Sequence, residues 1–279
     1  MKRITLALVL ALGLQLGMPT SVLAASGAGW ISSVCYSHTL QQDPITNPGP
    51  SGTLSPHLHD FLGALTTDSA STPDSLRAGG TCAGEPANSA ASWVPSLTIH
   101  GGATTVVPSA PQDKDGLVYY KSPSGLDVRP FPDGFSMIVG NAFATSLADN
   151  PDFSSGRSYW KCGPGSGTHL MHPPSQCSSG IMVTTYTFPQ FWDGVLVAGN
   201  EIPHMSFTRD AAHPDVLPRV QIYVRYTVGT APIGTVALAS GPDYTAHADY
   251  LFAWDQAAFG SLVTRCINAG VNCGTNPTP

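Results

Sequence analysis

Residues 220–228 read Val-Gln-Ile-Tyr-Val-Arg-Tyr-Thr-Val, and every second position from Val220 to Val228 is apolar or aromatic. Successive side chains of a β-strand point to opposite faces, so this alternation predicts a strand that packs one face against a core. Similar signals occupy residues 92–99, 116–120, 135–139 and 181–188. The chain is therefore expected to be mainly β.

The remaining segments give weaker signals. Residues 30–56 are rich in Ser, Pro, Gly and Asn and predict mostly extended loop. Apolar residues recur at helical spacing over residues 248–267, with Gly270 as a stop and Gly260 as a point where the helix could divide. No repeat and no long linker is present. We expect residues 25–279 to form one sandwich-like domain with long loops and a short C-terminal helix.

Composition excludes several classes of protein. The 279 residues include 12 Lys and Arg, 18 Asp and Glu, 29 Gly and 25 Pro, for a net charge of -6. So few charges argue against a coiled coil or a charged disordered chain. The negative balance, without a Lys/Arg run, argues against nucleic acid or a membrane as a partner. We expect a monomer.

Export is indicated at the N-terminus. Lys2 and Arg3 precede an apolar run and a small-residue cleavage site at Ala24, so residues 1–24 predict a secretory signal peptide and a secreted, extracellular protein. Six cysteines then suggest three disulfides among fifteen connectivities. Pairing nearest neighbours is the working hypothesis, and without a Cys-x-x-Cys pair a cysteine zinc site is disfavoured. The six are Cys35, Cys82, Cys162, Cys177, Cys266 and Cys273.

Histidines stand out among the ionisable residues. His57-Leu58-His59-Asp60 places two imidazoles on the same side of an extended segment, followed by a carboxylate. Such a pair can bind a divalent metal or act as base and acid near neutral pH. In isolation, a loop of hydrogen-bonding histidines positioned by Pro56 is the commoner explanation. His204 interrupts an apolar stretch and alone would indicate a core histidine.

Two further motifs combine a carboxylate with a ring. In His247-Ala248-Asp249, the carboxylate could orient His247 or cap the C-terminal helix, and capping is the commoner use. Trp192-Asp193 could stack a sugar ring and bind its hydroxyl groups, or could be a core tryptophan beside a turn, and the sequence leaves both interpretations open.

The spaced motifs together resemble a secreted bacterial and fungal family catalogued as domain of unknown function nineteen-ninety-six. Its members are often joined to carbohydrate-binding or wall-associated modules. The resemblance spans nearly all of the chain after residue 24. The matching pieces are residues 43–45, 57–63, 71–82, 93–95, 119–120, 131–138, 191–194, 203–206, 213–214, 247–250 and 254–255.

The resemblance implies secretion and a polar site that includes His57, His59, Asp60, His204, His247 and Asp249, but it supplies no reaction. Phe191 and Asp210-Ala211-Ala212 stand where relatives carry cysteines, which implies that one disulfide has been lost. A disulfide map therefore cannot be carried over from relatives.

The leading hypothesis is an enzyme that cleaves an extracellular or cell-wall polysaccharide, as a lyase or a hydrolase. His57 and His59 would act as base and acid or bind metal, Asp60 or Asp249 would orient an imidazole, and His204 would complete the cluster. Substrate contacts would come from Trp192, Asp193, Tyr119, Tyr120 and Arg77, with Arg77 or Arg129 neutralising a uronate in a lyase. A hydrolase would pair Asp60 with Asp249 or Asp193.

Two other hypotheses remain open. One is a non-catalytic module that binds an extracellular glycan. The other is a protein with a histidine-bound divalent metal, which ranks below acid–base catalysis because His-x-His alone is a weak metal signal.

Overall fold

The computed structural model describes residues 28–35, 37–41, 55–64, 66–68, 70–79, 82, 86–109, 115–123, 126–197 and 204–278, with the backbone alone for residues 37–41. The expected signal peptide and the motif at residues 43–45 lie outside the described residues. Within these ranges, every helix is too short or too polar to cross a lipid bilayer.

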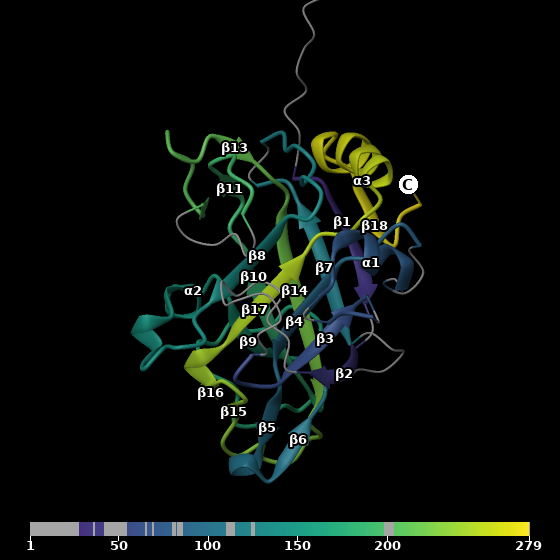
Figure 1. Cartoon of the computed structure of the whole chain (residues 1–279). Coiled ribbons are helices and arrows are strands. Elements are labelled where there is room, and N and C mark those ends of the chain that lie inside the picture. Colours follow the sequence, from purple (N-terminus) through teal and green to yellow (C-terminus); the bar gives the residue numbers. More distant parts are fainter. Residues whose placement is uncertain are drawn as a thin grey trace, which may run out of the picture.

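Two β-sheets form the body of the protein (Figure 1). The larger has six strands, all antiparallel to their neighbours except for the parallel pair β18 and β1. In spatial order they are β18 (Asn272–Thr275), β1 (Trp30–Cys35), β7 (Gly116–Lys121), β14 (Arg219–Thr227), β10 (Ile181–Thr187) and β9 (Tyr159–Cys162).

The second sheet has five antiparallel strands. They run β2 (Ser37–Gln41), β3 (His59–Gly63), β4 (Ala91–Pro95), β17 (His247–Leu251) and β8 (Ser136–Gly140). Strand β4 thus lies between β3 and β17, although these two are far apart in sequence.

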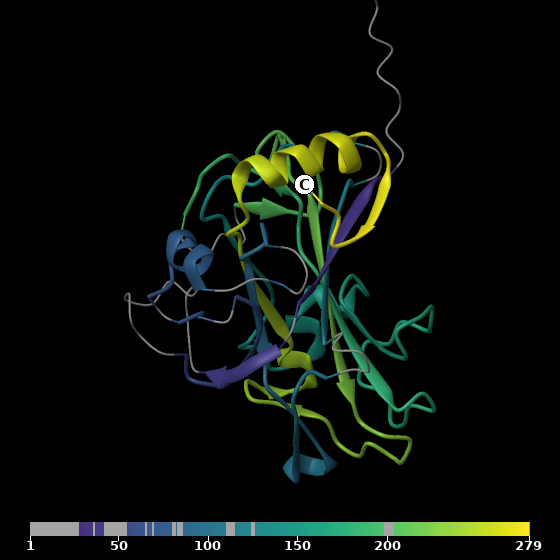
Figure 2. The same ribbon diagram turned by 90° about the vertical axis from the view of Figure 1, so that its right-hand side faces the viewer.

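Smaller elements extend this body. One four-stranded sheet comprises β16 (Gly241–Pro242), β15 (Ala237–Leu238), β5 (Leu97–Ile99) and β6 (Thr104–Val106), and a three-stranded sheet comprises β12 (Met205–Ser206), β11 (Phe191–Trp192) and β13 (Asp215–Val216). The helices are α1 (Pro73–Gly79), α2 (Pro151–Ser154) and α3 (Gln256–Leu262), which continues as a π-helical turn (Val263–Asn268). Three short 3₁₀ turns cover His100–Gly102, Leu147–Asp149 and Asp243–Thr245. Figure 2 shows α3 lying across one end of the molecule.

The main core lies between the two large sheets. On β14, the inward residues are almost fully buried, whereas Arg219, Gln221, Tyr223 and Arg225 are half-buried on the outer face. Leu62 of β3 and Tyr250 of β17 enter the same core from the other sheet. The strand alternation therefore has the predicted cause, and a mainly β, sandwich-like fold with a short C-terminal helix is confirmed.

Strand β1 corrects the expectation of a loop from residue 30 onward, as does the backbone of β2. Residues 30–35 pair with β7 on one side and β18 on the other. Ser32 and Ser33 are fully buried, and the Ser32 hydroxyl hydrogen-bonds to the Thr275 hydroxyl at 3.0 Å. Serine-rich composition concealed this strand, because the small Ser32 side chain can be buried when the sheet supplies a hydrogen-bond partner. The buried Ser33 hydroxyl has no hydrogen-bond partner among the described residues.

The C-terminal helix begins later than the sequence predicts. Residues 247–251 form β17, a strand buried on both faces. Its apolar residues Ala248 and Leu251 are three positions apart, a spacing that also fits one face of a helix. The helix instead starts at Asp255, whose carboxylate accepts a hydrogen bond from the backbone N–H of Ala258 at 2.8 Å. Gly260 lies inside α3 without breaking it, and the predicted stop at Gly270 has a φ of 70°.

Three disulfides confirm the nearest-neighbour pairing. They join Cys35 to Cys82, Cys162 to Cys177 and Cys266 to Cys273. The first ties the end of β1 to the segment before β4, and the last fastens the helical turn after α3 to β18.

Candidate metal centre

Three histidines meet at one end of the five-stranded sheet. The Nε2 atom of His247 lies 3.1 Å from Nε2 of His57 and 3.2 Å from Nε2 of His59. Each residue can offer a ligand atom to the same ion. His59 and His247 are buried and His57 is half-buried. We refer to His57, His59 and His247 as the histidine cluster.

The sheet register explains how these residues come together. His59 begins β3 and pairs with Pro95 of β4, while Asp249 of β17 pairs with Trp93 of the same strand. Extending that register by two residues places His247 beside Pro95 as well. Paired residues of neighbouring strands share a face, and the two strands that flank β4 are about 9.5 Å apart. Two imidazoles can span that distance above the short side chain of Pro95.

Burial keeps the cluster uncharged near neutral pH. The pKa of His59 falls well below its usual value because the ring is buried and because His247 and His57 lie beside it. Burial is also the main cause that lowers the pKa of His247 to about 4 and lowers that of His57. Neutral imidazoles keep the lone pair that a metal ligand needs.

Hydrogen bonding defines the tautomer of His247. Its Nδ1 lies 2.9 Å from the backbone oxygen of Thr245, which can only accept, so Nδ1 carries the proton. Nε2 therefore has a single lone pair, yet it faces two other Nε2 atoms. One lone pair cannot accept two full hydrogen bonds, whereas a cation in the middle would satisfy all three nitrogens.

The spacing also fits a metal ion. Tetrahedral zinc holds histidine nitrogens at 2.0–2.1 Å, which separates two such nitrogens by roughly 3.3 Å. The observed separations of 3.1 and 3.2 Å are close to that value. Three histidines leave a fourth position for water or substrate, which is the usual arrangement of catalytic zinc.

Asp60 does not orient the cluster. It follows His59 in β3, so its carboxylate points to the opposite face, into the main core, where its charge affects Tyr186 and Tyr226. Burial raises the pKa of Asp60 to about 7, and its Oδ2 has no hydrogen-bond partner among the described residues. The expected hydrogen bond from an imidazole to Asp60 is absent among the described contacts.

Asp249 lies on the same face of β17 as His247, two residues further along, and is buried. It remains a candidate positioning group for the cluster. It does not cap the C-terminal helix, because Asp255 does.

His204 belongs to a different group of residues. Its Nδ1 lies 2.6 Å from Oδ2 of Asp193, next to the short β11–β12 pairing. Trp192 is 3% exposed, donates its indole N–H to the Val195 carbonyl oxygen and lies under the Arg129 guanidinium. His204 therefore does not complete the histidine cluster, and Trp192 is not an open stacking surface for sugars.

The two candidate tyrosines lie on opposite faces of β7. Tyr120 is fully buried, and its hydroxyl contacts the Tyr250 hydroxyl and accepts a hydrogen bond from the Trp254 indole N–H. It cannot contact a substrate on the surface. Tyr119 is half-buried on the outer face of the six-stranded sheet, where a ligand can reach it.

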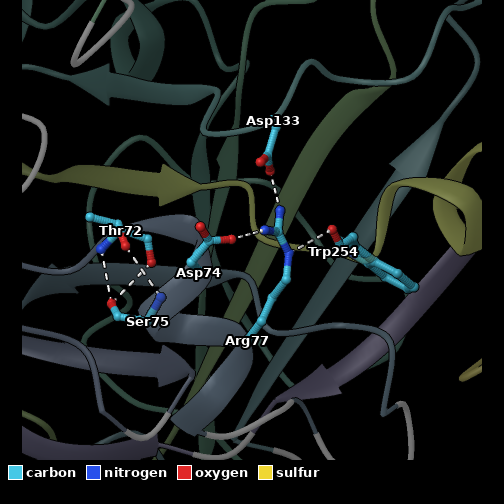
Figure 3. Close-up of polar contacts among 6 residues, drawn as sticks. All are labelled: Thr72, Asp74, Ser75, Arg77, Asp133 and Trp254. Atoms are coloured by element: carbon cyan, nitrogen blue, oxygen red, sulfur yellow. Dashed lines mark hydrogen bonds and ion pairs between the residues drawn. The ribbon is translucent and has the colours of Figure 1, made fainter.

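The arginines proposed to neutralise a uronate are already paired. Arg77 forms ion pairs with Asp74 and Asp133 and donates to the Trp254 carbonyl oxygen, which anchors α1 to neighbouring segments (Figure 3). Arg129 pairs with Asp215 at 2.7 Å. Both guanidinium groups thus serve structural contacts.

His247 is the ligand that the sequence did not assign to a metal. The sequence placed it among catalytic residues, but proposed only His57 and His59 as metal ligands. No local spacing could reveal the third ligand, because 188 residues separate His59 from His247.

The fold and the cluster define a mainly β sandwich protein with a three-histidine centre. Comparison with family models identifies its family: the chain belongs to the family described as Domain of unknown function (DUF1996), whose model matches residues 43–254. Comparison with curated proteins and with solved structures found no match.

Proposed function

We propose that this chain is a secreted metal-dependent enzyme whose His57, His59 and His247 side chains bind one divalent transition-metal ion. The convergence of three Nε2 atoms, with separations of 3.1 and 3.2 Å from His247, carries the proposal. Imidazole ligands suit zinc, copper, iron and nickel. Zinc is the first choice because its tetrahedral geometry matches the spacing.

The reaction class follows from the position that three ligands leave open. A metal ion there can lower the pKa of a bound water, or hold a substrate carboxylate and stabilise the charge that develops on it. The first mode fits hydrolysis and the second fits elimination from a uronate. We propose an extracellular polysaccharide as the substrate, in keeping with the resemblance to a family often linked to carbohydrate-binding modules.

Acid–base catalysis by the same histidines without a metal is less well supported. The lone pair of His247 Nε2 faces two other imidazoles rather than open space, and the lowered pKa values of His59 and His247 leave neither ring protonated near pH 7 to serve as the general acid. Secretion is supported by the three disulfides, which form and persist in oxidising compartments.

Elemental analysis tests the metal. Untagged protein, dialysed against zinc and then against buffer, should carry one zinc per chain, and His59→Gln should carry almost none. The matched control is His213→Gln, which removes a histidine that pairs with Asp210 outside the cluster. Zinc-free wild type, or equal zinc in wild type and His59→Gln, would refute the metal centre.

Activity is tested separately on a panel of neutral and acidic polysaccharides. Reducing ends report hydrolysis, and ultraviolet absorbance of unsaturated ends reports elimination. Chelation should abolish product formation, and added zinc should restore it in wild type and His213→Gln but not in His59→Gln. Product formation that survives both chelation and His59→Gln would exclude this centre as the catalyst.

A further inference from the structure

The outer face of the six-stranded sheet is unusually basic for this chain. Its six strands contain no Asp or Glu, yet they carry Lys121, Lys161, Arg219 and Arg225. The protein as a whole has 12 Lys and Arg, 18 Asp and Glu, and a net charge of -6. All four cations occupy positions on the outer face, because their neighbours in sequence point into the core. Lys161 is only 5% exposed there, so Lys121, Arg219 and Arg225 are the cations that reach solvent.

Aromatic rings lie among these cations. The ring centres of Trp30 and Tyr119 are 5.4 Å apart, and those of Tyr119 and Tyr223 are 5.3 Å apart. The Lys121 ammonium lies 4.5 Å from the centre of the Tyr119 ring, and the Lys161 ammonium lies 5.2 Å from that of Tyr223. Rings and positive charges therefore lie side by side on the three neighbouring strands β1, β7 and β14.

Three of the cations hydrogen-bond to neutral groups. Lys121 Nζ donates to Gln221 Oε1 at 2.7 Å, and Lys161 Nζ donates to the Gly165 carbonyl oxygen at 2.8 Å. Arg219 Nε donates to Gln190 Oε1 at 3.2 Å. These partners fix the side chains without cancelling their charge. Burial, with the charge of Arg219, lowers the pKa of Lys121 to about 8.

A polar cavity continues the same face at its edge. It has a volume of about 320 Å³. Gln221 and Thr187 connect it to the sheet, because the Gln221 amide donates to the Thr187 hydroxyl at 2.8 Å. Its lining comprises Arg157, Thr187, Phe207, Thr208, Arg219 and Gln221. Two arginines therefore border a space large enough for a small polar group, and Arg219 is the principal cation there because the Arg157 guanidinium also lies 4.0 Å from the Asp152 carboxylate.

We propose that this outer face binds an acidic polysaccharide, running from Trp30 and Tyr119 across Lys121 to the cavity between Arg219 and Arg157. Aromatic rings pack against the apolar faces of sugar rings. Guanidinium and ammonium groups bind carboxylates or sulfates through charge-assisted hydrogen bonds. A neutral glycan would form no charge-assisted contact with Lys121 and Arg219, whose side-chain acceptors are the neutral amides of Gln221 and Gln190, so these two charges favour the acidic class.

This surface is separate from the histidine cluster. His59 and His247 belong to the other large sheet, on its face turned away from the main core, whereas Tyr119 and Lys121 lie on the opposite outer surface of the sandwich. The inference therefore does not rest on the proposed metal centre. Polysaccharide binding here should persist in chelator and in His59→Gln, so each proposal can fail without the other.

Binding measurements on the full-length mature chain test the proposal. Polygalacturonate and dextran sulfate serve as carboxylate and sulfate probes, and unmodified dextran serves as the neutral control. We expect affinity for at least one acidic probe, weakening as salt rises, with no retention on dextran. Lys121→Gln and Arg219→Gln should each weaken binding about tenfold, as for the loss of one charge-assisted contact.

Two controls keep the test independent of folding. Lys121→Arg retains the charge and should keep most of the affinity, and Arg265→Gln removes an exposed cation from the helical turn after α3 and should bind as wild type. Absence of binding to both acidic probes would overturn the proposal. So would equal binding to dextran, equal or tighter binding to an oligothymidylate, or unchanged affinity in Lys121→Gln and Arg219→Gln.

Discussion

Nε2 of His59 and Nε2 of His247 lie 3.2 Å apart, although 188 residues separate them in the chain. Each residue begins a strand, and both strands flank β4. The proximity therefore exists only when the five-stranded sheet is assembled. A metal ion that uses both nitrogens would bind the folded chain far better than the unfolded one.

Zinc should stabilise the protein against heat. A ligand that binds only the folded state at a hundred times its dissociation constant adds about 2.7 kcal/mol. For a domain of this size, that corresponds to a rise in Tm of about 5–10 °C. Differential scanning fluorimetry of metal-free protein with and without zinc measures it. His247→Gln should show almost no rise, and an equal rise in that variant would contradict binding through His247.

Substitution of Asp60 should leave metal binding intact. Its carboxylate points into the main core, on the face of β3 opposite to His59. Asp60→Asn should thus retain one zinc per chain by elemental analysis, with an affinity within about threefold of wild type by competition with a chelating dye. Loss of zinc in a folded Asp60→Asn protein would show that this carboxylate supports the cluster after all.

Adjacent tyrosines of β7 should differ in their effect on stability. Tyr120→Phe removes the acceptor of the buried Trp254 N–H, whose hydrogen bond to the Tyr120 hydroxyl is 3.0 Å long. An unsatisfied buried donor costs about 1–3 kcal/mol, so the free energy of unfolding should fall by that amount. Tyr119→Phe, on the outer face, should change it by less than about 0.5 kcal/mol. Urea denaturation followed by tryptophan fluorescence measures both, and equal losses would contradict the assigned faces.

The disulfides should contribute unequally. The Cys35–Cys82 bridge spans 47 residues and the Cys266–Cys273 bridge spans 7. Loop-closure entropy predicts stabilisation of about 4 kcal/mol for the first and about 2.5 kcal/mol for the second. Paired replacement of each bridge by alanines, followed by urea denaturation, should therefore cost more at Cys35–Cys82. The reverse order would mean that native contacts around the bridges outweigh chain entropy.

Binding of polygalacturonate should weaken as the solution becomes basic. The pKa of Lys121 is lowered to about 8, so its positive charge is lost as pH rises through that value, while uronates stay ionised. Burial raises the pKa values of the facing Tyr119 and Tyr223, which keeps them neutral, and Arg219 remains a cation. Affinity for polygalacturonate should fall between about pH 7 and pH 9.5. A bound anion raises the pKa of the Lys121 ammonium, which moves the fall toward the upper end of this range. Lys121→Arg should show little fall, and an equally steep fall in that variant would exclude Lys121 as the cause.

Much of the fold follows from local patterns. Residues 220–228 alternate between apolar and polar because one face of β14 is buried and the other reaches solvent. Any strand with one buried face shows this alternation in its own sequence, so it can be predicted without knowledge of its neighbours. The sequence patterns did not predict strands β1 and β17, for opposite reasons. Buried serines made β1 look polar, and the spacing of the apolar residues Ala248 and Leu251 made β17 look like part of a helix.

Sequence patterns were also correct for some of the candidate site residues and wrong for others. Sequence patterns identified His57, His59 and His247, but they also grouped them with His204, Asp60, Tyr120 and Trp192. Strand alternation places Asp60 and Tyr120 in the core, and Trp192 is covered by local contacts. These outcomes depend on which face of a sheet becomes the inside.

The sequence by itself determined the secondary-structure class, the six cysteines available for three disulfides, and the histidines worth attention, because these depend on composition and on spacing along the chain. Tertiary structure alone decided which histidines meet and that the basic and aromatic residues of four strands share one outer face. Both depend on the order and register of strands that are distant in sequence, and that order follows from packing the whole core rather than from any local pattern.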